Sequence, residues 1–167
     1  MNFSSDKFKF ASRFIQSTNR GLLFPGEGRI EVAAGVLSPQ KKDEPGAVYE
    51  TSVYLHEDTN DIPWDVGAKM FKVAGTNAEK KVPVASIELP CQELEGLGLT
   101  VKVEKNDYSD KHANIVGWSD DLGSRDIEAA NLLDKGKLVL RPERENALRE
   151  KASRVKPRSG VAKKSKS

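Results

Sequence analysis

Alternation of apolar and polar residues is the feature that most limits the fold of this chain. We predict strands where the alternation recurs, over residues 10–16, 29–36, 48–56, 81–88, 99–104, 112–118 and 137–141. Each such segment buries one face only, so each needs neighbouring strands and a covering layer.

A helical period interrupts this pattern. Apolar residues recur at steps of three and four at Ile62, Val66, Met70 and Ala74. We predict further helices at 90–97, from a Ser124 cap to Asp134, and from Pro142. Because strands and helices do not strictly alternate, we expect an α+β fold with a mixed, largely antiparallel sheet of about seven strands and three or four short helices.

Charge divides the chain into two parts. The last 17 residues hold seven of the 27 basic residues and none of the 25 acidic ones, which leaves residues 1–150 with a net charge of −5. We predict a single α+β domain over 1–141, a charged helix over 142–150 and a disordered basic tail over 151–167. The seven cations are Lys151, Arg154, Lys156, Arg158, Lys163, Lys164 and Lys166. Such a segment binds nucleic acid phosphates, lies on an anionic membrane, docks on an acidic protein surface or stays solvated.

Several classes of protein are disfavoured. No run approaches 18 apolar residues, so no transmembrane segment is expected. Cys91 is the single cysteine, which excludes an internal disulfide and indicates a small buried residue. Two histidines are too few for an ordinary zinc site, and no metal or cofactor is predicted. The basic, serine-containing segment Met1–Gly21 also suits an organellar presequence, but its alternation favours a first strand. It contains no apolar stretch of the kind found in secretory signals, so export is not expected.

Two predicted strands carry the candidate catalytic residues. His112 and Asn114 project from one face of a strand, and Glu50 and Ser52 share a face of another. If the strands are neighbours, these side chains bring together a nucleophile, a base and an orienting group. Alternatively, His112 opens its strand and bonds a neighbouring loop. His56, at a strand end, is interpreted as part of a solvated turn.

Trp64 and Trp118 are the candidate partner-binding residues. Both lie near the ends of predicted elements, where a tryptophan usually forms the rim of the core. The alternative is that the two indoles share an exposed patch that binds a protein partner.

The order of five segments resembles a known group. The segments are Arg13–Gln16, Glu50–Tyr54, Trp64–Gly67, Gly98–Val101 and His112–Trp118. In this order they are similar to a group of small, functionally uncharacterised proteins of bacteria and their mobile elements. The likeness spans about Arg13 to Pro142, and it implies a bacterial cytoplasmic setting but no particular activity.

Three functions remain open. The leading one is a non-catalytic interaction module, whose folded body binds a protein partner and whose basic tail binds nucleic acid or an acidic surface. The second is a small enzyme acting on nucleotides or nucleic acid through His112, Asn114 and Glu50. The third is a structural component of a ribonucleoprotein or phage assembly.

Overall fold

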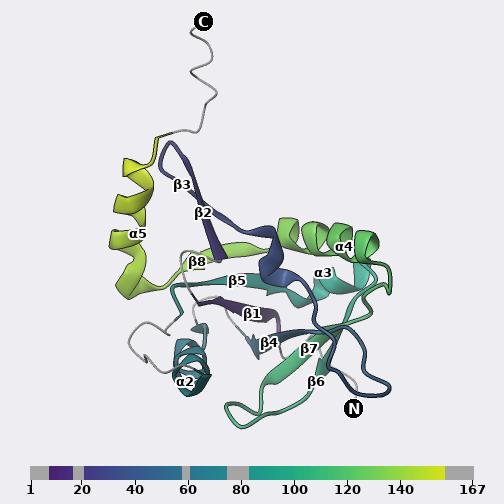
Figure 1. The fold of residues 1–167 in the computed structure, drawn as a ribbon. Helices are drawn as coiled ribbons and strands as arrows, with labels where there is room; N and C mark the ends of the chain where they lie inside the picture. Colours follow the sequence, from purple (N-terminus) through teal and green to yellow (C-terminus); the bar gives the residue numbers. More distant parts are fainter. Residues whose placement is uncertain (1–7, 17–20, 58–60, 75–82, 157–167) are drawn as a thin grey trace, which may run out of the picture.

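The computed structural model describes residues 8–16, 21–57, 61–74 and 83–156. A six-stranded antiparallel sheet forms its centre, with a separate two-stranded hairpin and four α-helices around it (Figure 1). In chain order the elements are β1 (Phe10–Ile15), β2 (Leu22–Gly26), β3 (Arg29–Val32), the 3₁₀ helix η1 (Ala34–Leu37), β4 (Thr51–His56), α2 (Trp64–Ala74), β5 (Ala85–Pro90), α3 (Cys91–Gly96), β6 (Thr100–Val103), β7 (His112–Val116), α4 (Leu122–Lys135), β8 (Lys137–Leu140) and α5 (Pro142–Arg154). The predicted α+β class is confirmed.

Strand β1 lies at the centre of the sheet, whose order is β6-β7-β4-β1-β5-β8. Every neighbouring pair in it is antiparallel. Ser12 of β1 stands opposite Tyr54 of β4 on one side and Glu88 of β5 on the other. The sheet therefore brings together residues from distant parts of the chain.

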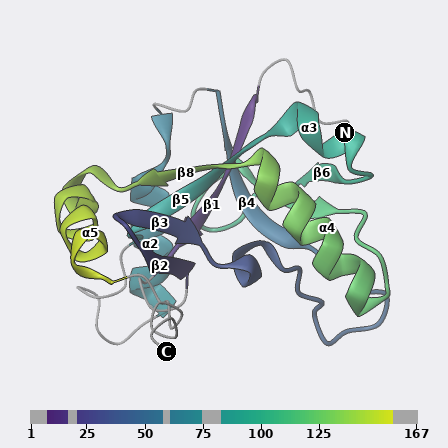
Figure 2. The same cartoon turned by 90° about the horizontal axis from the view of Figure 1, so that it is seen from above.

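The main core lies on one face of this sheet. Inward-facing strand residues such as Val53, Leu89 and Ile115 are completely buried there against Leu37 of η1 and Leu132 of α4. Figure 2 shows α4 lying across this face, with the β2–β3 hairpin and α5 at its other end. Burying the apolar side of each strand here supplies most of the driving force for folding.

The opposite face is covered differently. Helix α2 packs on it through a small cluster that contains Phe14, Tyr54 and Ile62, with Trp64 partly buried beside them. Gly67 permits this approach, because an added Cβ would lie 2.8 Å from the Pro83 ring and 2.9 Å from Phe14. The remaining strand residues of this face are mostly polar.

The β2–β3 hairpin was not predicted, and the strand predicted at 29–36 is shorter than expected. Glu27 and Gly28 both have positive φ, 59° and 73°, which is the geometry of a two-residue type I′ hairpin turn. Strand β3 ends at Val32, and η1 follows because a 3₁₀ turn buries Leu37 completely.

Predicted boundaries of other elements also shift in the structure. Strand β5 starts at Ala85, later than expected, and residues 81–82 lie outside the described residues. Helix α4 is capped by Asp121 rather than by Ser124. The Asp121 side chain accepts a hydrogen bond at Oδ2 from the backbone N–H of Ser124, at 2.8 Å. Helix α5 extends to Arg154 instead of ending at 150, because Ala152 is completely buried. Residues 151–154 are therefore helical, and residues 157–167 lie outside the described residues.

Candidate functional site

The second face of the sheet carries two clusters of polar side chains. Strands alternate their side chains, so residues two apart share a face. The register places on this face Ser12 of β1, Ser52 and His56 of β4, Ser86 and Glu88 of β5, and His112 and Asn114 of β7. No described side-chain nitrogen or oxygen atom that is buried lacks a hydrogen-bond partner.

The first cluster is centred on Glu88. Its carboxylate accepts hydrogen bonds from Ser12 Oγ at 2.7 Å and from Ser86 Oγ at 2.5 Å, both at Oε2. His56 Nε2 lies 2.5 Å from the other oxygen, Oε1, and 2.8 Å from Ser12 Oγ. Glu88 is 1% exposed and His56 is 4% exposed. The interpretation of His56 as part of a solvated turn is wrong.

Donor directions show what this first cluster does. A hydroxyl has one hydrogen, and Ser12 donates it to Glu88, so the single Nε2–H of His56 is shared between Glu88 Oε1 and Ser12 Oγ. His56 therefore uses Nε2 as a donor and cannot take the Ser12 proton there. The cluster satisfies a buried carboxylate, and its geometry is that of a structural network.

The second cluster joins Ser52 to His112. The strands β4 and β7 are neighbours, and Ser52 Oγ lies 2.7 Å from His112 Nε2. His112 Nδ1 lies 2.6 Å from the backbone carbonyl oxygen of Glu104, and the imidazole packs against the Tyr54 ring with centroids 5.2 Å apart. Burial raises the pKa of the Tyr54 phenol, while the hydrogen bond from Asn106 opposes that shift.

Asn114 and Glu50 do not contact this pair in the way that we expected. Asn114 is buried and donates from Nδ2 to Glu104 Oε1 at 3.1 Å. Glu50 lies just before β4, where its backbone pairs with Gln40. Among the hydrogen bonds of the described residues, none joins the Glu50 carboxylate to His112. The carbonyl of Glu104 takes the orienting position that we assigned to a side chain.

The two tryptophans do not form a common exposed patch. Trp118 is 8% exposed, belongs to the main core and donates from Nε1 to the Ile115 carbonyl at 2.9 Å. Trp64 lies on the other face of the sheet with α2. Cys91 is buried, and burial raises the pKa of its thiol to about 12.

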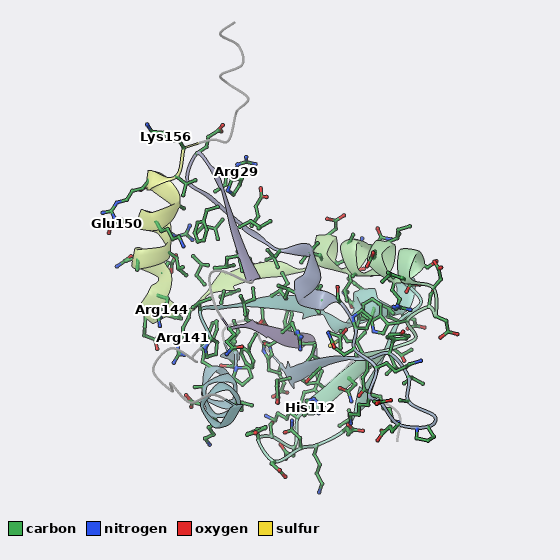
Figure 3. All side chains as sticks on the ribbon, in the orientation of Figure 1. Arg29, His112, Arg141, Arg144, Glu150 and Lys156 are labelled. Carbon is green, nitrogen blue, oxygen red and sulfur yellow. The ribbon has the colours of Figure 1, made fainter. Side chains whose placement is uncertain are left out.

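A basic surface lies over α5. Arg144, Lys151 and Arg154 recur at steps of seven and three, which places them on one flank of the helix. Lys151 Nζ lies 4.6 Å from the centroid of the Phe24 ring on β2. Figure 3 shows Lys156, where α5 has ended, at the same end of the molecule as Arg29 of the hairpin.

Neighbouring carboxylates neutralise part of this surface. Arg149 pairs with Glu145 at 2.8 Å, and Arg154 pairs with Glu150. Among the ion pairs of the described residues, none involves Arg144, Lys151 or Lys156. A groove of about 490 Å³, lined by Ala147, Glu150, Lys151, Arg154 and Val155, runs along the same flank.

Comparison with models of known protein families, with curated proteins and with solved structures found no match. The resemblance of the five segments to bacterial and mobile-element proteins thus stays a prediction. Within the described ranges, no helix has the length and apolar character needed to cross a membrane.

Proposed function

We propose that this chain is an interaction module that binds nucleic acid through α5 and the basic segment that follows it, and a protein partner through its folded body. The observation that carries the nucleic-acid part is the basic flank of α5. Arg144 and Lys151 lie there without an ion pair among the described residues, and the flank leads into five further cations between Lys156 and Lys166.

The physical argument is electrostatic. Leu148 and Ala152 anchor α5 on the fold, so the flank presents its cations at fixed positions. Lysine and arginine side chains that neutralise phosphates release condensed counterions, and this release drives binding at low salt. Residues 155–167 contain no aromatic side chain for base stacking, so we expect contacts to the phosphate backbone and little dependence on base sequence.

Exposed apolar side chains support the protein-partner part. Leu122 and Ile127 of α4 are each 64% exposed. Apolar surface left in water on a rigid element favours contact with another protein.

The test of nucleic-acid binding uses two full-length variants of equal charge. In the first, Lys156, Arg158, Lys163, Lys164 and Lys166 are replaced by glutamine. In the control, five exposed lysines of other regions are replaced, namely Lys42, Lys69, Lys105, Lys111 and Lys135. Both variants lower the net charge from +2 to −3, so only the position of the charge differs.

Fluorescence anisotropy with a short labelled DNA duplex, measured over a series of salt concentrations, is the readout. The first variant should lose affinity, and the slope of log K against log salt should become shallower by about 4 to 5, because each phosphate contact contributes about 0.9. The control should keep the wild-type slope. Equal losses in the two variants, or no wild-type binding at low salt, would refute the nucleic-acid proposal.

The partner surface needs a separate experiment. A double variant, Leu122→Ser with Ile127→Ser, should lose a protein that copurifies with the wild-type chain. Leu23→Ser with Val103→Ser, which alters apolar residues that are 48% and 42% exposed elsewhere, should retain it. Retention by both variants would remove α4 as the partner surface.

A further inference from the structure

Two serine–histidine pairs lie on the same face of the sheet, and they differ in the direction of the hydrogen bond. Ser12 and His56 belong to the buried Glu88 network, whereas Ser52 and His112 lie between β4 and β7. The direction decides whether the imidazole is able to accept a proton from the serine. Only one of the two pairs meets that condition.

His112 has its proton on Nδ1. The neighbour of Nδ1 is the Glu104 carbonyl oxygen at 2.6 Å, and a carbonyl accepts but never donates. In the neutral imidazole, Nε2 is then the acceptor, and Ser52 donates its hydroxyl proton to it across 2.7 Å. This is the tautomer and geometry with which a histidine acts as general base toward a serine.

Ser12 cannot react in this way. Its hydroxyl proton goes to Glu88, His56 donates to it, and it is 0% exposed. Ser52, in contrast, is only partly buried. The same fold therefore contains one serine whose hydroxyl donates to an imidazole nitrogen and one whose hydroxyl does not.

The surroundings of Ser52 hold it in place. The guanidinium of Arg13 donates from Nη1 to the Ser52 carbonyl and from Nε to the Val36 carbonyl, both at 3.0 Å. His112 and Asn114 are only 8% and 3% exposed. A substrate therefore reaches the hydroxyl of Ser52 rather than the imidazole of His112 or the amide of Asn114.

We infer that Ser52 is a nucleophile, with His112 as its general base, for the acyl group of carboxylic esters. Ser52 Oγ forms a bond to the acyl carbon as its proton moves to His112 Nε2. The bond from the acyl carbon to the leaving oxygen then breaks, and the alcohol departs with that proton. Water hydrolyses the acyl-serine by the same route, releasing the carboxylic acid and restoring Ser52. This activity is separate from nucleic-acid binding.

The experiment uses the full chain with two probes, a fluorophosphonate that labels activated serines and p-nitrophenyl acetate. Peptide mapping after labelling should find the phosphonate on Ser52 and not on Ser12. Ser52→Ala should abolish that label and bring ester hydrolysis to the rate in buffer. His112→Asn, which keeps a donor for the Glu104 carbonyl, should slow labelling by about a hundredfold, the usual contribution of a general base.

Ser153→Ala removes an exposed serine of α5 that donates to a backbone carbonyl and has no histidine partner in the described structure, so it should behave as wild type. Thermal melting establishes that each variant is folded, and duplex binding by Ser52→Ala should match the wild type. The inference is overturned if the phosphonate labels Ser153 as readily as Ser52. It is also overturned if labelling of Ser52 is equally fast in His112→Asn, or if the native chain takes up no label.

Discussion

Replacing Glu88 by glutamine tests whether the buried cluster is structural. The substitution keeps the shape of the side chain but turns one acceptor oxygen into a donor NH₂ group. Glu88 accepts from Ser12, Ser86 and His56, so at least one of these donors would then face another donor. Each hydrogen bond to a charged group contributes about 1.5–3 kcal/mol, and leaving a buried donor without an acceptor costs about 1–3 kcal/mol more. We therefore expect Glu88→Gln to lower the free energy of unfolding by about 3–5 kcal/mol.

Glu150→Gln is the matched control for that substitution. Glu150 also pairs with a basic group, Arg154, but its side chain is 61% exposed. Exposed ion pairs contribute little, so the control should change the free energy of unfolding by no more than about 0.5 kcal/mol. Urea denaturation followed by circular dichroism measures both, with equal m-values as the condition for comparing midpoints. A loss below about 1 kcal/mol for Glu88→Gln, less than the cost of leaving one buried donor without an acceptor, would refute the reasoning.

Three further predictions concern the core, the thiol and a helix cap. Leu132→Ala should cost about 2–5 kcal/mol in urea denaturation because Leu132 is completely buried, whereas Ile127→Ala, at 64% exposure, should cost far less. Cys91 should react with iodoacetamide only after unfolding, because burial raises its pKa to about 12; alkylation of the native chain at the rate of a free thiol would contradict this. Hydrogen bonds from Ser124 lower the pKa of Asp121, so the cap stabilises the fold above the unfolded pKa of that carboxyl and stops doing so as the pH falls through the folded one. Asp121→Ala should thus lower the melting temperature at neutral pH, with a difference that shrinks in acid; a constant difference would contradict this.

Local patterns in the sequence predicted most of the strands because one face of each is buried in the main core. Strands β1, β6 and β7 begin within one residue of the predicted positions. The hairpin β2–β3 was missed because its turn, Glu27-Gly28, places a glutamate at positive φ, where Asn or Gly is the usual signal. The end of α5 was misplaced because the completely buried Ala152 is not recognisable in a sequence of charged neighbours.

The candidate site could be predicted only in part, for a reason of topology. His112 and Asn114 were correctly placed on one face from their spacing, but whether Ser52 reaches His112 depends on β4 and β7 being neighbours. The Glu88 cluster was missed altogether. Ser12, His56 and Glu88 come from three strands separated by 32 to 76 residues, and only the order β4-β1-β5 brings them together. The available signal was a carboxylate in the otherwise uncharged segment Val84–Pro90.

The position of the Glu88 cluster suggests what the buried Glu88 carboxylate does in the sheet. A buried carboxylate with its polar partners seldom stabilises a protein more than apolar residues of the same volume would. Ser12, however, bonds to both neighbouring strands at once, and β1 pairs with β4 over only three residues in register. A slip of one residue in one direction would turn Ser12 onto the apolar face and set Ala11 in its place opposite Glu88, leaving the carboxylate without that donor. Such a slip would destabilise the central strand of the sheet. We therefore expect the network to fix the register of β1. Because β1 pairs with β4, the network also fixes the position of Ser52 beside His112.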